Sequence, residues 1–138
     1  MPAPTKNMEK CTSGALLFLR LVVGIAFLIH GWGKLQNPMA WMGPEAPVPG
    51  FFQLLAAISE FGGGLALVLG LLTRIGMMGL GFTMLVATCM MAFVNHAPFV
   101  SMGGPSYELS LTYLAVAVLF FHVGPGMFSL DAKLFGTK

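Results

Sequence analysis

The chain has 138 residues, of which 57% are hydrophobic and only 9% are charged, and its mean hydropathy is strongly positive. Soluble domains carry about a quarter charged residues, so this composition argues against a soluble protein. The net charge of +2 comes from scattered residues without a basic tract, which argues against a nucleic-acid partner.

Four apolar segments predict four membrane-spanning helices, at residues 14–35, 51–72, 75–94 and 107–123. A spanning helix needs about 20 apolar residues, and the last segment is the shortest of the four. Loops rich in proline and glycine separate the first segment from the second and the third from the fourth. The sequence therefore predicts an all-α membrane protein, a single domain over residues 1–138 that forms an antiparallel bundle of four transmembrane helices.

Basic residues predict which side of the membrane holds the termini. Four spans place both termini on one side, together with the turn between the second and third spans, and most of the basic residues fall there: Lys6, Lys10, Arg74, Lys133 and Lys138. Because basic residues favour the cytoplasmic side, both termini are predicted to be cytoplasmic. Beyond the fourth span, Ser129 can cap a short C-terminal helix in the membrane interface.

Three predicted helices each carry a stripe of polar and small residues at helical spacing. The first stripe holds Arg20, Gly24, Phe27, Gly31 and Lys34, with His30 at its border; the second holds Gln53, Ala56, Ala57, Glu60, Gly63 and Gly64; the third holds Glu108, Thr112, Ala115, Leu119 and His122. Because a lone charge in mid-membrane costs about 2.5 to 3.5 kcal/mol, we expect all three stripes to face a common polar interior.

The depth of each charge predicts its partner. Arg20 lies about 9 Å and Glu60 about 18 Å from the inner ends of their spans, a difference that an arginine side chain can bridge. Lys34 and Glu108 lie at similar outer levels, with His30 one turn below. We therefore expect Arg20 to pair with Glu60, and Glu108 to pair with Lys34 or His30; a contact between Glu60 and His30 stays open. Such pairs either fix the helix register or take part in chemistry.

The two cysteines, Cys11 and Cys89, form no CxxC motif and are predicted at different membrane depths. A disulfide between them is not expected, and both are predicted to be buried thiols that fill space. This removes the thiol relay that membrane disulfide-forming enzymes need.

Four sequence elements occur in order along the chain: "HGWGKL" (30–35), "EFGGGLALVLGLLTR" (60–74), the Tyr-Glu pair at 107–108 and "GPGMFSLD" (124–131). With these elements the chain resembles the DoxX family of four-helix membrane proteins, from about residue 14 to 133. The resemblance implies a multi-pass protein of the bacterial or archaeal inner membrane. Some relatives are subunits of thiosulfate:quinone oxidoreductase or were linked to terminal quinol oxidases, and others are associated with oxidative-stress complexes.

A quinone is the cofactor most compatible with these residues. The sequence has no CxxCH motif, no iron–sulfur cysteine set and no dinucleotide fingerprint, and no metal site is predicted. His30 and His122 are predicted at opposite ends, which disfavours a haem between them, although His96 could approach His30. Quinone carbonyls need hydrogen-bond donors that also supply protons, and the tail needs a slot open to lipid.

The leading hypothesis is therefore a membrane subunit that binds quinone, or a similar lipophilic molecule, and receives electrons from a partner protein. In this hypothesis Glu60 and Glu108 transfer protons and His30 donates to the quinone oxygen. Arg20 and Lys34 stabilise the ionised carboxylates, with Phe27 and Trp32 beside the ring. A non-catalytic membrane scaffold for a partner protein and a small-solute transporter stay open as alternative functions, and the chain can form a homo-oligomer in any of these cases.

Overall fold

The computed structural model describes residues 6–136, and these residues form helices joined by loops, without a strand. Lys138, part of the basic set above, lies outside them. The elements are α1 (Lys6–Leu35), α2 (Gly50–Leu69), α3 (Thr73–Cys89), the π-helical turn η1 (Met90–Val94), α4 (Glu108–Val123) and α5 (Leu130–Phe135). Ser129 caps α5 as predicted, because its hydroxyl accepts a hydrogen bond from the Ala132 backbone N–H.

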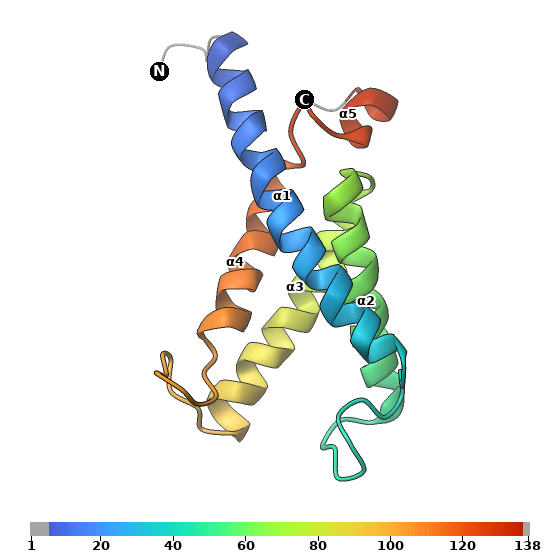
Figure 1. The fold of residues 1–138 in the computed structure, drawn as a ribbon, viewed down its shortest axis with the longest axis vertical. Coiled ribbons are helices and arrows are strands. Elements are labelled where there is room, and N and C mark those ends of the chain that lie inside the picture. Colours follow the sequence, from blue (N-terminus) through green and yellow to red (C-terminus); the bar gives the residue numbers. More distant parts are fainter. Residues whose placement is uncertain (1–5, 137–138) are drawn as a thin grey trace.

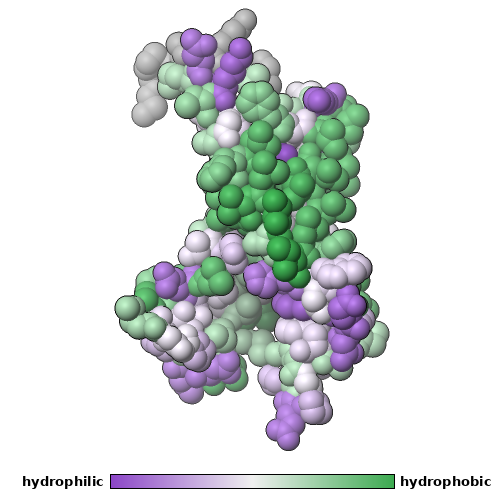
Figure 2. Space-filling model, in the orientation of Figure 1, coloured by the Kyte–Doolittle hydropathy of each residue, from purple (hydrophilic) through white to green (hydrophobic). Residues whose placement is uncertain are grey.

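Three helical stretches are long and apolar enough to cross a membrane: Asn7–Leu35, Gly50–Leu69 and Thr73–Val94, the last of which joins α3 to η1. α4 is apolar but shorter. In Figure 2 an apolar band separates two more hydrophilic ends of the molecule. This surface indicates contact with the lipid bilayer.

The two ends of the molecule differ in construction (Figure 1). One end, called the loop end here, carries the first loop (residues 36–49) and the second loop (residues 95–107). The other, called the tail end, carries the short turn between α2 and α3 and the tail segment (residues 124–136) that includes α5. Gly70 ends α2 with a φ of 63°, a conformation that favours glycine, so the chain turns at once into α3.

Glycines lie in the most extensive helix contact, between α1 and α2. A Cβ atom on Gly24 would lie 3.0 Å from the Gly64 carbonyl oxygen, and one on Gly64 would lie 2.8 Å from the Gly24 carbonyl oxygen. α2 also packs on α3, and α3 packs on α4. The buried core is apolar and joins all four helices: Val23, Phe27, Leu67, Met77, Leu80, Met84, Ala117 and Phe120.

Two of the three predicted stripes face the interior. On α1, Arg20, Gly24, Phe27 and Gly31 are buried, and on α2 the buried set includes Gln53, Ala57, Glu60, Gly63 and Gly64. The stripe on α4 is the exception, since all five of its residues are exposed. α4 instead packs through the opposite side, with Ala117 and Phe120 buried. The prediction of three stripes around one polar interior is therefore wrong for α4.

Candidate functional site

A buried ion pair joins α1 to α2 in the half of the molecule toward the loop end. The Lys34 Nζ atom lies 2.6 Å from Glu60 Oε1. The Glu60 side chain is 3% exposed and that of Lys34 is 23% exposed, so a ligand can approach the pair from the lysine side. The second carboxylate oxygen, Glu60 Oε2, is buried and has no hydrogen-bond partner within residues 6–136. The site thus holds an acceptor that no described group satisfies.

The close approach of the two helices explains why this lysine reaches this glutamate. One helical turn from Lys34, a Cβ atom on Gly31 would lie 2.5 Å from the backbone N of Phe61 and 2.7 Å from its Cα. Only glycine permits this separation, and it brings the last turn of α1 against the middle of α2. The Lys34 side chain then reaches Glu60 on the neighbouring helix.

The first loop covers the ion pair. The Trp41 ring lies 4.2 Å, centroid to Nζ, from Lys34, a distance at which a cation is attracted to an indole face. Trp41 Nε1 donates to the backbone oxygen of Gln53 at 3.0 Å. The Gln53 side chain then accepts from Met42 N at 3.1 Å and donates to the Val48 oxygen at 2.8 Å. Gln53 therefore fastens the loop over the site.

Sequence reasoning missed these two contributors to the site. From the sequence, Trp41 has no predicted role in a site, and Gln53 is placed only in the stripe of the second predicted helix. The available signal was that Gln53 shares a face with Glu60 on an otherwise apolar helix. A buried amide of that kind needs partners for both its donor and its acceptor, and a polar loop was the nearest source.

Arg20 does not pair with Glu60, so that prediction is wrong. Arg20 is 1% exposed, and its guanidinium donates to four backbone carbonyl oxygens. The acceptors are Leu67 at 2.7 Å and Val68 at 3.3 Å in α2, and Pro125 and Phe128, both at 2.9 Å, in the tail segment. Carbonyls in the last turn of a helix lack partners within the helix and attract a cation. Arg20 therefore joins α1, the end of α2 and the tail segment.

Asp131 also binds backbone groups at a helix end, in this case at the start of α3. Its Oδ1 accepts from Leu72 N at 2.7 Å and its Oδ2 accepts from Thr73 N at 3.0 Å. Its own backbone N–H donates to the Gly70 oxygen at 2.8 Å. A carboxylate satisfies N–H groups that a helix start leaves unpaired, so α5 is attached to the α2–α3 turn.

Glu108 and His30 are exposed, and neither takes part in an ion pair in the described part of the chain, where Lys34–Glu60 is the one found. The predicted contacts of Glu108 with Lys34 or His30, and of Glu60 with His30, are therefore wrong. Glu108 opens α4 on the outward side of that helix. His30 lies at the edge of the α1 stripe, with its ring centroid 6.4 Å from that of Phe27.

The remaining predicted residues occupy different surroundings. Phe27 is buried, and its ring packs in a tilted arrangement against that of Tyr113 of α4, with 4.7 Å between centroids. Trp32 is 60% exposed, and its ring lies 6.1 Å from that of Phe61. Cys11 and Cys89 are free, as expected, but both are exposed rather than buried. The structure thus brings together Lys34, Glu60 and Trp41, and leaves Arg20, Glu108 and Trp32 outside that contact set.

An all-helical chain with three apolar helices of spanning length, a fourth apolar helix and inward-facing charges is a multi-pass membrane protein. The family model that matches it, over residues 15–96, is DoxX, and the chain belongs to the DoxX family. It is similar to a protein of Escherichia coli (strain K12) named "Inner membrane protein YqjF", with 35% identity over 92% of this chain and 97% of that protein. The family and this relative place the chain in the inner membrane.

Two further relatives extend the comparison. An "Uncharacterized protein" of Haemophilus influenzae (strain ATCC 51907 / DSM 11121 / KW20 / Rd) is 32% identical over 94% of this chain and 97% of its own length. The protein of Bacillus subtilis (strain 168) named "Putative oxidoreductase CatD" is 29% identical over 95% of each chain. No solved structure matches the chain.

Proposed function

We propose that this protein is the membrane-embedded subunit of an oxidoreductase system, and that it binds a quinone or a similar lipophilic molecule beside the Lys34–Glu60 pair. The observation that carries the proposal is the buried Glu60 carboxylate with one oxygen unpartnered, next to a lysine that is still partly exposed. Ionisable residues within membrane spans mark ligand or proton pathways more often than they serve as simple packing. The name of the Bacillus subtilis relative supports the redox context.

The chemistry assigns a role to each group. Reduction of a quinone takes two electrons and two protons, and the electrons come from a partner protein. The Lys34 ammonium has three donors, of which Glu60 occupies one, so a second can bind a ring carbonyl oxygen. Glu60 accepts and passes protons through its unpartnered oxygen. His30 lies at the edge of the helix face that carries Phe27. It is the second hydrogen-bond donor to the quinone, which enters from the lipid.

Other groups stay outside this proposal for geometric reasons. The Arg20 donors are held by backbone carbonyls, and Glu108 points away from the interior. Trp41, which covers Lys34, takes the place beside the ring that was predicted for Trp32.

We also propose an antiparallel bundle of four spans whose tail end faces the cytoplasm. Support comes from exposed Lys10, Arg74 and Lys133, which lie in the segments that form that end. A C-terminal reporter that is active only in the cytoplasm tests the orientation, and activity of a periplasmic reporter at the same position contradicts it.

Quinone titration of the purified full chain tests the ligand, with tryptophan fluorescence as the readout. The chain has two tryptophans, so Trp32→Phe leaves Trp41 as the reporter above the ion pair, and Trp41→Phe leaves Trp32 on the exposed side. Ubiquinone-1 and a short-chain menaquinone should quench Trp41 fluorescence in a saturable way. Trp32 fluorescence should fall only linearly with quinone concentration, as expected when the quinone dissolves in the detergent without binding.

Variants separate binding from stability. Lys34→Met should weaken quinone binding about tenfold, the value of one charge-assisted hydrogen bond, and Lys133→Met should leave it unchanged. Glu60→Gln should keep the fold and lose turnover with a redox partner. If no quinone is retained or bound, and Glu60→Gln lowers only stability, the chain is a scaffold and the proposal fails.

A further inference from the structure

Two hollows in the half toward the tail end share the residues Leu72 and Ile75. One is a groove of about 380 Å³ between α2 and α3. The other is a pocket of about 280 Å³ at the tail end, bounded by the start of α3 and by the tail segment. Because Leu72 and Ile75 line both, the pocket and the groove are adjacent. An elongated ligand that passes over these two side chains would occupy both.

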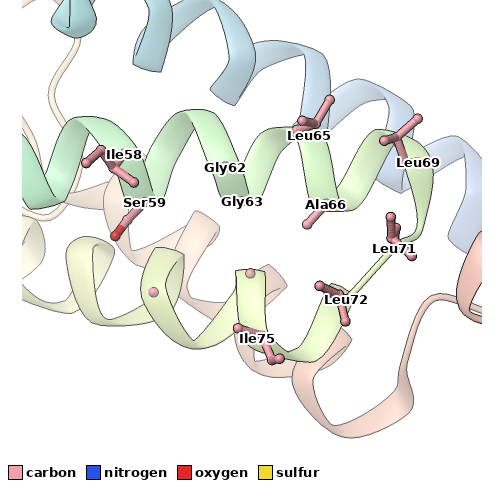
Figure 3. A pocket seen from close by; sticks show the side chains of 12 residues that line it. Ile58, Ser59, Gly62, Gly63, Leu65, Ala66, Leu69, Leu71, Leu72 and Ile75 are labelled. Carbon is pink, nitrogen blue, oxygen red and sulfur yellow. The ribbon is translucent and has the colours of Figure 1, made fainter.

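The groove is apolar, narrow and open to the bilayer. Figure 3 shows it between the two helices, with Ser59 and Ala66 on the α2 side and Ile75 on the α3 side. It extends along α2 from Ile58 to Leu69, about 16 Å at the rise of a helix. A Cβ atom on Gly62 would meet nothing within 4 Å, so the missing side chain leaves space. These dimensions suit one acyl chain.

The pocket at the end of this groove holds one charge of each sign. Arg74 is exposed and has no ion-pair or hydrogen-bond partner from its side chain within residues 6–136. Asp131 also lines the pocket, and its two oxygens each accept one backbone N–H. A carboxylate offers about four acceptor positions, so two remain. Thr73 lines the same pocket with a buried hydroxyl that has no partner in the described chain.

We propose that this combined hollow binds a phospholipid with a zwitterionic head group that carries a primary ammonium, as in phosphatidylethanolamine. Arg74 binds the phosphate, Asp131 accepts hydrogen bonds from the ammonium, and one acyl chain lies in the α2–α3 groove. A purely anionic head group is repelled by Asp131, and a choline head group has no N–H to donate to it. The site is separate from the proposed quinone site, so either can fail alone.

The test measures thermal unfolding of the full chain in detergent with added lipid. Lipids that differ only in the methylation of the head-group nitrogen, from phosphatidylethanolamine to phosphatidylcholine, probe Asp131 without altering it. Half-maximal stabilisation should need about tenfold less of the unmethylated lipid than of phosphatidylcholine or phosphatidylglycerol. Glycerophosphoethanolamine, which has the head group but no acyl chain, should give no stabilisation at tenfold higher concentration.

Two variants with matched controls locate the site. Arg74→Gln should raise the phosphatidylethanolamine concentration needed about tenfold, whereas Lys133→Gln, an exposed cation at the same end that does not line the pocket, should not. Gly62→Leu fills the groove and should abolish the lipid effect with the unfolding temperature in lipid-free detergent retained. Gly14→Leu, on α1 with nothing within 4 Å of the added Cβ, is its control.

Three results would overturn the proposal. Equal stabilisation by all the lipids would show that lipid binds the surface without specificity. An unchanged lipid stabilisation of Gly62→Leu would show that the acyl chain does not lie in the groove. A change of oligomeric state in Gly62→Leu, without any dependence on head group, assigns the groove to a second copy of the chain.

Discussion

Replacement of Arg20 by methionine tests the most connected charged side chain of the molecule. Methionine keeps an apolar stem of similar length but removes the four hydrogen bonds to backbone oxygens of α2 and the tail segment. A buried carbonyl without a partner costs about 1–3 kcal/mol. The Leu67 oxygen also accepts from Gly70 N, so it keeps one partner. Relief from burying the guanidinium offsets part of the loss, and we expect a net decrease of about 3–5 kcal/mol in unfolding free energy.

The measurement is an equilibrium unfolding titration in detergent micelles, combined with tryptic cleavage at Lys133. Arg20→Met should lower the unfolding free energy and speed cleavage, because the tail segment loses its contact with α1. Arg74→Met is the matched control: its side chain is exposed, so the change in lipid-free detergent should be below about 0.5 kcal/mol.

A double-mutant cycle with Glu60→Gln separates the observed contacts from the ion pair predicted by depth alone. Arg20 and Glu60 share no hydrogen-bond partner, so their effects should add within about 0.5 kcal/mol. A coupling energy above about 1 kcal/mol, or full stability of Arg20→Met, would refute the reasoning.

Three further changes follow from the same contacts. Gly31→Ala should lower the unfolding free energy by about 1–3 kcal/mol, because the new Cβ overlaps the α2 backbone, whereas Gly33→Ala, which meets nothing within 4 Å, should be neutral or stabilising in the same titration. Asp131→Ala should cost about 1–2 kcal/mol by removing the cap of α3, and calorimetry would show no loss if the tail segment were detached in solution. Gln53→Ala should free the first loop and speed cleavage at Glu45 by a Glu-specific protease, with an unchanged rate as the contrary result.

Hydrophobic runs predicted the helices, and the composition of the stripes predicted the inward faces of α1 and α2. The face that carries glycines and charges is the one least suited to contact lipid, so the apolar face turns outward. The same logic failed for α4. Thr112 donates to the Glu108 carbonyl oxygen of its own helix at 2.8 Å, so its hydroxyl needs no interior. Glu108 and His122 lie in the first and last turns, where head groups and water are near. A polar stripe predicts burial only when its polar groups lie at mid-membrane and lack local partners.

The sequence also could not predict the helix register, that is, which residues of α1 lie beside which residues of α2. Counting from the ends of apolar runs put Arg20 within reach of Glu60. The actual register follows from Gly24 facing Gly64 and Gly31 facing Phe61, which brings Arg20 to the end of α2 and Lys34 within side-chain reach of Glu60. The glycines are visible in the sequence, but which one faces which depends on side-chain fit over the whole contact. The partners of Arg20 are backbone oxygens, which residue types cannot reveal.

The use of the buried polar groups links the two proposed sites. Arg20, Gln53, Ser129 and Asp131 each satisfy backbone groups at a helix end or in a loop, and these contacts explain their burial without any ligand. Two buried side-chain oxygens in residues 6–136 lack a partner, Glu60 Oε2 and Thr73 Oγ1. The first belongs to the Lys34 pair and the second lies in the wall of the tail-end pocket. A buried acceptor or hydroxyl without a hydrogen-bond partner destabilises the fold. A bound molecule that forms a hydrogen bond to either of these two oxygens would therefore gain the most binding free energy.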